Sequence, residues 1–291
     1  MPRPRDISAI DTLIGFRDVE THRASTVPGA KLGWDKHPAE YMFKDTPDDL
    51  AADVDPMSTI DETLAAMDKH NVGVGVIHLT DERAETALRC HPDRFVGVKP
   101  IDANLGMDAV RTIQRLHDEF DIRGITMFPS GLKPTVPIND RRWYPIYAKC
   151  IELDIAAFCT TGVPGPRVPF MPQYVGHIDE VCYDLPELKF VMRHGAEPWE
   201  DLAIKLLMKW PNLYYSTSAF APKYWPDKIV EFANKRGADK VIYAGYYPMG
   251  LELDRIFREM DDVPFRDDVW PKFLRDNAAK VLRIIPPASR R

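Results

Sequence analysis

Eight short apolar runs, separated by segments with helical periodicity, restrict the folds open to this chain of 291 residues. The runs are residues 8–14, 72–79, 95–101, 122–128, 155–160, 188–193, 213–218 and 240–246. Between the first two lie residues 57–71, in which Ile60, Leu64 and Met67 recur on one helical face. Strands that alternate with helices predict a parallel sheet, and eight such units predict a closed (β/α)8 TIM-type barrel.

The length of the chain agrees with a single barrel. Barrels of this type commonly run to about 250 residues as one domain, and a hydrophobic content of 45% supplies a large core. We therefore expect residues 1–291 to form one domain. Residues 17–55 form a long insertion after the first strand, which we interpret as a lid or partner surface because long loops in compact domains usually serve a function. Residues 286–291 are expected to form a flexible tail.

Charge, hydropathy and cysteine content exclude several classes of protein. The formal net charge is −6 and the basic residues are scattered, so there is no basic stripe that would bind nucleic acid. No apolar run reaches the roughly 18 residues needed to cross a membrane, and the chain does not begin with a signal-peptide pattern. The four cysteines include no CxxC pair, which is typical of reduced thiols. We therefore expect a cytoplasmic protein that acts on a small molecule.

The barrel prediction also indicates where chemistry takes place. Barrel enzymes build their active sites at the carboxyl ends of the strands and in the loops that follow. Polar and aromatic residues at these positions are Asp11, His78, Asp81, Lys99, Asp102, Phe128, Thr160, Thr161, Arg193, His194, Ser216, Ser218, Tyr246 and Tyr247. The active site is expected among these residues.

Four strand ends carry sequences that resemble a known family. They read Ile-Asp-Thr at 10–12, Cys-Thr-Thr-Gly at 159–162, Phe-Val-Met-Arg-His-Gly at 190–195 and Val-Ile-Tyr-Ala-Gly-Tyr-Tyr-Pro at 241–248. These segments resemble the amidohydrolase-related family, which includes aminocarboxymuconate-semialdehyde decarboxylase and related aromatic-acid decarboxylases. The resemblance extends over nearly the whole chain and implies the same barrel and an enzymatic activity.

The family pattern contains metal ligands that this chain has mostly lost. The two histidines of the first strand fall on Leu13 and Gly15, the histidine of the fifth strand falls on Thr160, and the aspartate of the eighth strand falls on Tyr246. Of the pattern, only His194 remains. The zinc chemistry that the resemblance would otherwise imply has therefore lost most of its ligands.

A catalytic zinc ion needs three protein ligands and an open position. We therefore expect no metal ion and no other cofactor. A metal-dependent alternative would need relocated ligands, and His194, Asp11 and Cys159 are the one set that we consider. Asp11 lies two residues before the usual ligand position, which places its side chain at a different depth in the barrel.

Without a metal ion, side chains must move protons and stabilise charge. His194 is predicted to be the general acid or base because histidine titrates near neutral pH; the alternative is a hydrogen-bonded remnant of the lost metal site. Tyr246 is predicted to donate a hydrogen bond to an oxyanion, since a phenol is a weak base at neutral pH; the alternative is an aromatic filler of the former metal cavity. Of Tyr246 and Tyr247, we expect only Tyr246 to point inward.

Two carboxylates are further candidates for catalysis. Asp11 either faces the site or tethers the loop after the first strand. Glu197 follows the His-Gly pair and precedes Pro198, so it is either a catalytic group or a cap of the next helix. Ser216 and Ser218 lack the Gly-x-Ser-x-Gly pattern of a serine nucleophile.

Four residues are predicted to contact the substrate. Arg167 lies in a Pro/Gly turn after the fifth strand, and its guanidinium suits a carboxylate or a phosphate. Thr160 and Trp199 lie near the mouth of the barrel, and Lys44 lies on the insertion. For Arg167 and Lys44 the alternative is a solvated surface charge.

These residues predict a metal-independent enzyme that acts on a small carboxylated or carbonyl-bearing compound. The reaction is either hydrolysis, such as opening of a lactone ring, or a decarboxylase-like lyase step. Two alternatives stay open: a catalytically inactive protein that binds a ligand or stabilises a partner, and a metal-dependent amidohydrolase with relocated ligands. The resemblance also implies a homodimer, to which the insertion would contribute.

Overall fold

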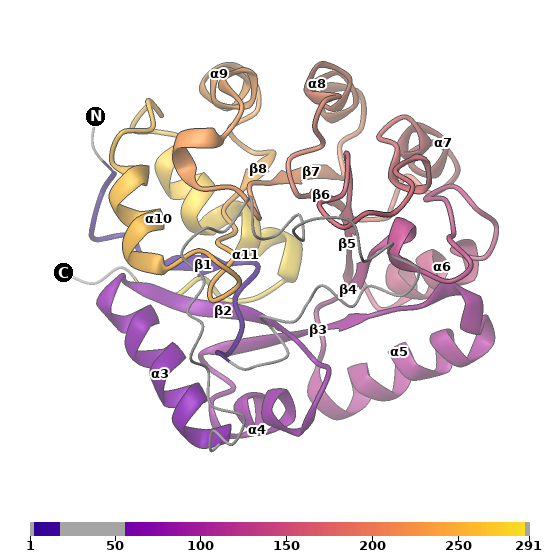
Figure 1. Cartoon of the computed structure of the whole chain (residues 1–291), viewed down its shortest axis with the longest axis horizontal. Helices are drawn as coiled ribbons and strands as arrows, with labels where there is room; N and C mark the ends of the chain where they lie inside the picture. The colour runs from indigo at the N-terminus through magenta and orange to yellow at the C-terminus, as the bar shows by residue number, and fades with distance from the viewer. Residues whose placement is uncertain (1–2, 18–55, 289–291) are drawn as a thin grey trace.

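The computed structural model describes residues 3–17 and 56–288 and contains an eight-stranded parallel sheet in the order β1 to β8. The strands are β1 (Ala9–Asp11), β2 (Val72–His78), β3 (Phe95–Pro100), β4 (Gly124–Met127), β5 (Ala156–Thr160), β6 (Phe190–Arg193), β7 (Leu213–Ser216) and β8 (Val241–Ile242). Each strand pairs with the next in sequence, and the sheet curls into a barrel with helices around it (Figure 1). The predicted TIM-type barrel is confirmed.

The helices of the described residues follow the strands in the expected alternation. They are α3 (Pro56–Lys69), α4 (Glu82–Cys90), α5 (Met107–Phe120), α6 (Tyr144–Glu152), α7 (His177–Asp184), α8 (Glu200–Lys209), α9 (Asp227–Lys235), α10 (Leu253–Met260) and α11 (Asn277–Leu282). Short helices are η1 (Ala103–Leu105), η2 (Pro129–Gly131), η3 (Met171–Gln173), η4 (Pro222–Tyr224) and the π-helix η5 (Lys272–Asp276). Helix α5 buries Val110, Ile113 and Leu116 on one face, as their spacing requires.

The last strand is much shorter than the predicted run of residues 240–246. It ends at Ile242, and the backbone N–H of Tyr243 donates to the carbonyl of Phe273, in η5, at 2.9 Å. Beyond this point, hydrogen bonds from loop residues connect β8 to β1. Thr12 donates to the carbonyl of Tyr243 from its backbone nitrogen at 3.3 Å and from Oγ1 at 2.9 Å. These bonds join the carboxyl ends of β1 and β8.

Two hydrophobic clusters lie on the two sides of the strands. An inner cluster fills the barrel with side chains such as Val76, Phe158 and Val191 and also includes residues of α11, whose Asn277 binds the carbonyl of Val241 at the start of β8. A larger outer cluster packs the strands against the surrounding helices. Helix α11 therefore closes the amino end of the barrel and leaves the carboxyl ends of the strands for a site.

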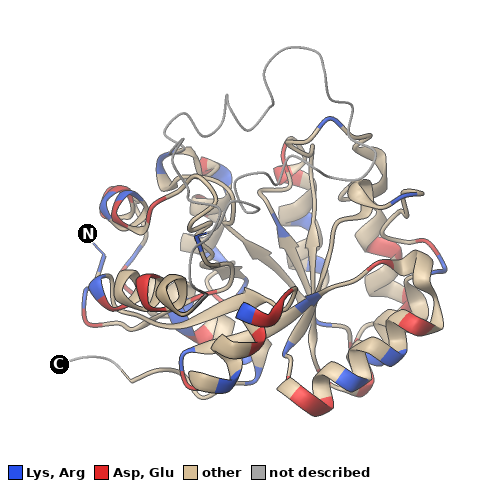
Figure 2. Ribbon diagram, turned by 60° about the horizontal axis from the view of Figure 1, so that its bottom comes forward, with Lys and Arg blue, Asp and Glu red and all other residues tan. Residues whose placement is uncertain are grey.

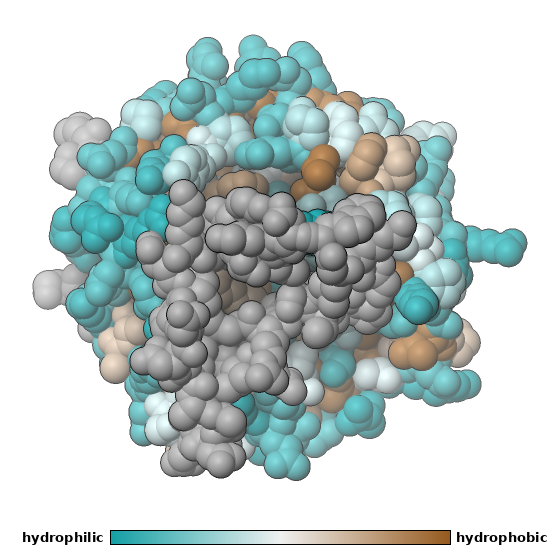
Figure 3. Space-filling view, in the orientation of Figure 1, coloured by the Kyte–Doolittle hydropathy of each residue, from teal (hydrophilic) through white to brown (hydrophobic). Residues whose placement is uncertain are grey.

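The surface carries charges of both signs. Lys and Arg alternate with Asp and Glu along the outer helices (Figure 2). The face seen in Figure 3 is mainly hydrophilic around its edge, with scattered apolar residues. Among the described helices, none is both long enough and apolar enough to span a bilayer. The predicted insertion, apart from Arg17, and the last three residues of the predicted tail lie outside the described residues.

Candidate active site

The alternation of side chains along the strands decides which residues face the interior of the barrel. His78, Thr160 and Arg193 are the last residues of β2, β5 and β6. In each of these strands, the residue two positions earlier belongs to the inner cluster. Since strand side chains alternate with a period of two, all three residues point inward at the same end of the barrel.

Arg193 lies at the centre of this end of the barrel and is 2% exposed. Its Nη1 lies 3.1 Å from Nε2 of His78, and its Nη2 donates to the carbonyl of Thr12 at 2.8 Å. The guanidinium carbon lies 4.7 Å from the ring centroid of Phe158. Burial lowers the pKa of Arg193, but a guanidinium keeps its charge at neutral pH. The barrel therefore holds a positive charge below its mouth.

His78 is neutral in this arrangement. A guanidinium can only donate hydrogen bonds, so Nε2 of His78 accepts the bond from Arg193 and the ring proton is on Nδ1. Burial, together with the charge of Arg193, lowers the pKa of His78 to about 3. His78 therefore orients the guanidinium and adds no charge of its own.

His194 begins a turn directly after β6 and is held by Ser218. Its φ is 64°, and the next residues, Gly195 and Ala196, also have positive φ. The backbone N–H of His194 donates to Oγ of Ser218 at 3.1 Å, and Nδ1 lies 3.1 Å from the same oxygen. Burial and the charge of Arg193 lower the pKa of His194 to about 3. The imidazole is therefore neutral at physiological pH, whereas the sequence predicted titration near neutral pH.

The two tyrosines after β8 have different aromatic and charged partners. The ring of Tyr246 meets His194 edge to face, with centroids 5.6 Å apart. Burial raises the pKa of Tyr246, and the charge of Arg193 opposes that rise. Tyr247 belongs to the outer cluster and packs against the guanidinium of Arg17. Tyr246 is thus the phenol at the site.

Asp11 is completely buried at the junction of β1 and β8. Its Oδ1 accepts the backbone N–H of Leu13 at 3.0 Å and that of Gly245 at 2.7 Å. Burial raises the pKa of Asp11 from 3.8 to about 6, and these two bonds oppose the rise. Of the two roles considered for Asp11, this geometry favours the tether of the loop after the first strand.

Glu197 lies before the helix that it was considered to cap. Helix α8 begins at Glu200, so neither Glu197 nor Pro198 lies in its first turn, and the capping alternative is wrong. The carbonyl of Glu197 accepts the backbone N–H of Val163 at 2.8 Å, which joins the loops after β5 and β6. Burial raises the pKa of the half-buried Glu197 side chain, and Glu200 adds to the rise.

The predicted substrate contacts are distributed along the rim. Thr160 is half-buried at the end of β5, and Arg167 is half-buried in the loop that follows. Trp199 packs against the rings of Phe170, at a centroid distance of 5.5 Å, and Tyr174, at 5.0 Å. Lys44 lies outside the described residues.

A divalent cation does not fit the described part of this site. No group of three or more His, Cys, Asp or Glu side chains in residues 3–17 and 56–288 is placed to hold a metal ion. The relocated set that we considered is not assembled, because Cys159 belongs to the outer cluster, on the opposite side of β5 from Thr160. The buried charge of Arg193 would also repel a cation.

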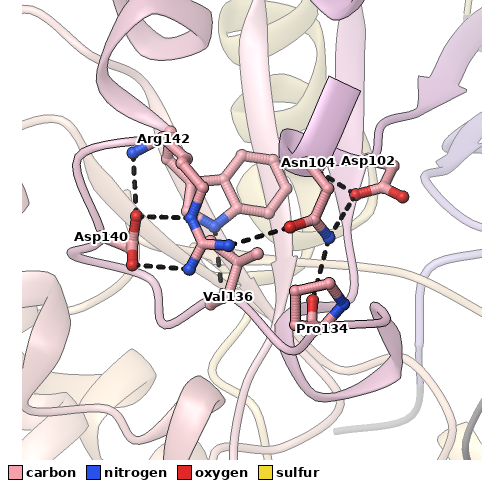
Figure 4. A network of polar contacts seen from close by, with 7 residues as sticks. Asp102, Asn104, Pro134, Val136, Asp140 and Arg142 are labelled. Atoms are coloured by element: carbon pink, nitrogen blue, oxygen red, sulfur yellow. Dashed lines mark hydrogen bonds and ion pairs between the residues drawn. The ribbon is translucent and has the colours of Figure 1, made fainter. Parts of the chain in front are cut away.

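A polar network fixes the rim next to the site (Figure 4). Arg142 binds both carboxylate oxygens of Asp140, at 2.9 and 2.8 Å, and donates to Oδ1 of Asn104 at 2.9 Å. Nδ2 of Asn104 donates in turn to Asp102 and to the carbonyl of Pro134, both at 2.9 Å. The hydrogen bonds from Arg142 lower the pKa of Asp140 to about 2. The loops after β3 and β4 are thereby joined.

Sequence reasoning placed Arg193 and His78 at strand ends but gave neither residue a role. The available signal was parity: each lies two residues after an apolar residue of a buried run, on the side that faces the interior. The contact between them joins residues 115 positions apart, so only the folded barrel reveals it.

Comparisons with known proteins agree with the barrel. A family model described as amidohydrolase matches residues 18–284. A curated relative, the 2-keto-4-carboxy-3-hexenedioate hydratase of Sphingobium sp. (strain NBRC 103272 / SYK-6), is 26% identical over 122 residues. That match covers 36% of this chain and 36% of the hydratase.

Solved structures share the fold over nearly the whole chain. An uncharacterised TIM-barrel protein from Bordetella bronchiseptica superposes with a TM-score of 0.75 and 23% identity, covering 94% of this chain and 98% of its own. The 2,6-dihydroxybenzoate decarboxylase from Rhizobium superposes with a TM-score of 0.67 and 15% identity, covering 95% and 99%. At these identities the likeness is one of fold.

Proposed function

The chain belongs to the amidohydrolase family, and from that premise we propose that it is a decarboxylase-like lyase whose own side chains take the place of a metal ion. Its substrate class would be small carboxylated or carbonyl-bearing compounds. A decarboxylase among the proteins of the same fold and a hydratase among the curated relatives support lyase chemistry. We also propose a cytoplasmic location, which the spacing of the cysteines favours, and a homodimer, which the family resemblance implies.

The observation that carries this proposal is the neutral imidazole of His194 at the mouth of the barrel. Ser218 occupies its Nδ1, so Nε2 is the ring nitrogen left for a substrate. An anionic substrate near His194 would oppose the effect of Arg193 and raise the pKa of the imidazole. His194 would then take up a proton when the substrate binds and hold it next to the substrate.

In decarboxylation, the proton held by His194 replaces the CO2 group on the substrate carbon. The bond between the carboxylate carbon and its neighbour breaks, CO2 leaves, and the electron pair stays on the substrate as an enolate-type anion. The Tyr246 hydroxyl would donate a hydrogen bond to the developing oxyanion. The imidazolium of His194 would give its proton to the substrate carbon and return to the neutral state.

The same observation favours a lyase over a hydrolase. Opening a lactone requires a base that removes a proton from water, and an imidazole that has taken up a proton on substrate binding cannot act as that base. Protonation of a carbanion needs an acid instead. Among the remaining candidates, Thr160, Arg167, Trp199 and Lys44 would bind substrate, whereas Asp11 and Glu197 would shape the loops.

Release of CO2 by the chelator-treated protein tests the proposal. The panel is a set of small acids with an oxo or hydroxyl group next to the carboxylated carbon, beginning with 2,6-dihydroxybenzoate. We expect turnover that persists after chelation and that falls about 100- to 10,000-fold in His194→Asn. His117→Asn, on α5, is the matched control and should leave turnover unchanged.

Three outcomes would contradict the proposal. Equal turnover by His194→Asn and the native protein would remove His194 from the mechanism. Turnover that depends on added zinc or manganese would favour the metal-dependent alternative. Binding of acids with no CO2 release from any of them would favour the catalytically inactive alternative.

A further inference from the structure

Arg193 makes no direct ion pair in the described part of the chain, although the carboxylate of Asp11 lies close enough to raise its pKa against the effect of burial. No ion pair joins it to a carboxylate of residues 3–17 or 56–288. Its partners are a neutral imidazole, a backbone carbonyl and the face of the Phe158 ring. An isolated buried charge costs several kcal/mol in solvation, so proteins usually pair such a charge or use it.

Other arginines of this chain lie directly against a carboxylate. Arg3 is 6% exposed, and its Nε, which makes no hydrogen bond to the described residues, lies 3.6 Å from a carboxylate oxygen of Asp261. Arg142 binds Asp140 through Nε and Nη2 and Asn104 through Nη1 (Figure 4). Arg193 is different because the acceptors around it carry no charge.

Arg193 also has N–H groups that make no hydrogen bond to the described residues. A guanidinium has five N–H donors, and the contacts with His78 and Thr12 use one each on Nη1 and Nη2. Nε is buried and has no hydrogen-bond partner among the described residues. Buried N–H groups of native proteins nearly always have partners, so this donor points to a ligand.

Several residues around Arg193 are less buried than the guanidinium itself. His78, Thr160, His194 and Tyr246 are all half-buried and therefore in contact with solvent, whereas the guanidinium lies deeper. These neutral polar groups lie at the same end of the barrel as the guanidinium.

We propose that the Arg193 guanidinium is the anion-binding floor of this site and takes one carboxylate or enolate oxygen group of the ligand. A planar guanidinium matches a planar carboxylate through two parallel hydrogen bonds. One cation among neutral donors suits a singly charged group. That the bound group is also the one that reacts rests on the proposed function.

Benzoate and benzamide are the probes, because they have the same shape and differ in charge. In the 15N-labelled native protein, benzoate should shift the Nε–H resonance of Arg193 saturably and slow its exchange with water. Benzamide should not. The Nε–H resonance of Arg142 is the internal control, since Asp140 already occupies that group. Arg193→Lys, which lacks the Nε–H group, assigns the resonance.

Stability gives an independent test. Arg193→Met removes an unpaired buried charge, so without ligand it should unfold a few degrees higher than the native protein. Benzoate should raise the unfolding temperature of the native protein and not that of Arg193→Met. The affinity for benzoate should fall on the order of 10- to 100-fold, while Arg142→Met should bind as the native protein does.

An unmoved Arg193 resonance under saturating benzoate would overturn the inference, as would benzamide binding as tightly as benzoate. The two proposals fail separately. CO2 release with an unmoved Arg193 resonance rejects the anion site alone. Benzoate binding at Arg193 without CO2 release from any acid supports the anion site and rejects the lyase.

Discussion

At the residue scale, burial and the guanidinium of Arg193 together shift the pKa values of the groups at the site. The charge of Arg193 adds to burial in lowering the pKa of both His78 and His194, and it opposes the rise at Tyr246. From the sequence alone, only the ordinary pKa values of these three residues would be available. Burial, together with this cation, therefore keeps both histidines neutral well below neutral pH.

Ser216 and Ser218, two positions apart, give a matched pair of predictions. Ser216 is buried and its Oγ has no partner among the described residues, whereas Ser218 binds His194 twice. Ser216→Ala should leave the free energy of unfolding unchanged or raise it by up to about 1 kcal/mol, because an unsatisfied hydroxyl is removed. Ser218→Ala should lower it by about 1 to 2 kcal/mol.

Urea unfolding at neutral pH measures both serine variants. Equal effects of the two substitutions would mean that the hydrogen bonds of Ser218 add nothing to stability. Ser218→Ala should also reduce turnover through the loss of His194 orientation, while Ser216→Ala should not.

At the scale of elements, the junction of β1 and β8 is the point at which the barrel departs most from regular strand pairing. Strand β8 has two residues, and the contact is completed by Thr12 and by the carboxylate of Asp11, which accepts the N–H of Gly245. A Cβ at Gly245 would collide with Oδ2 of Asp11. The absence of a side chain at Gly245 therefore makes the junction possible.

Glycine substitutions at this junction should separate a required glycine from a tolerant one. Gly245→Ala should lower the free energy of unfolding by about 1 to 3 kcal/mol, because the collision displaces a buried carboxylate. Gly15→Ala is the control: the nearest atom to its Cβ is Cδ of Pro248, at an ordinary 3.6 Å. That variant should stay within about 0.5 kcal/mol. Denaturant unfolding of both variants checks this, and a stable Gly245→Ala would contradict it.

At the scale of the whole molecule, the barrel separates stability from chemistry. The outer cluster holds the strands to the helices and α11 closes the amino end, so the polar groups are concentrated at the carboxyl end. The rim network of Arg142 adds a link between the loops after β3 and β4. The barrel can therefore contain a buried cation without a direct ion pair among the described residues, because the packing of strands against helices supplies the stability.

The two histidines of the site predict how stability depends on pH. His78 and His194 have pKa values of about 3 in the folded protein against 6.5 for an ordinary histidine, so the unfolded chain binds more protons between these values. Stability should therefore fall as the pH drops from about 6.5 toward about 3. Asp11, raised to about 6, contributes in the opposite sense, since its burial is favoured when it is protonated.

His78→Gln isolates one histidine from the other titrating groups. Glutamine can still accept the hydrogen bond from Arg193 but does not titrate. Urea unfolding of the native protein and the variant, compared at about pH 7 and about pH 4.5, should show a smaller acid loss in the variant. Identical losses would mean that His78 does not carry the effect.

The amino-acid sequence by itself determined the barrel, since strand and helix periods are local and eight alternating units close in only one common way. It also indicated which strand ends meet and that Tyr246 rather than Tyr247 belongs to the motif. The first conclusion follows from the rule that barrel sites lie at the carboxyl ends of the strands, and the second from the resemblance to the family motif.

Only the tertiary structure decided the electrostatics of the site. The contact of Arg193 with His78, the grip of Ser218 on His194 and the tether formed by Asp11 join residues 24 to 234 positions apart. Burial and charge act through space, so a histidine predicted to titrate near neutrality becomes a neutral group once a buried guanidinium lies beside it. The spacing of residues in the sequence does not show how close a guanidinium and an imidazole lie in the folded protein.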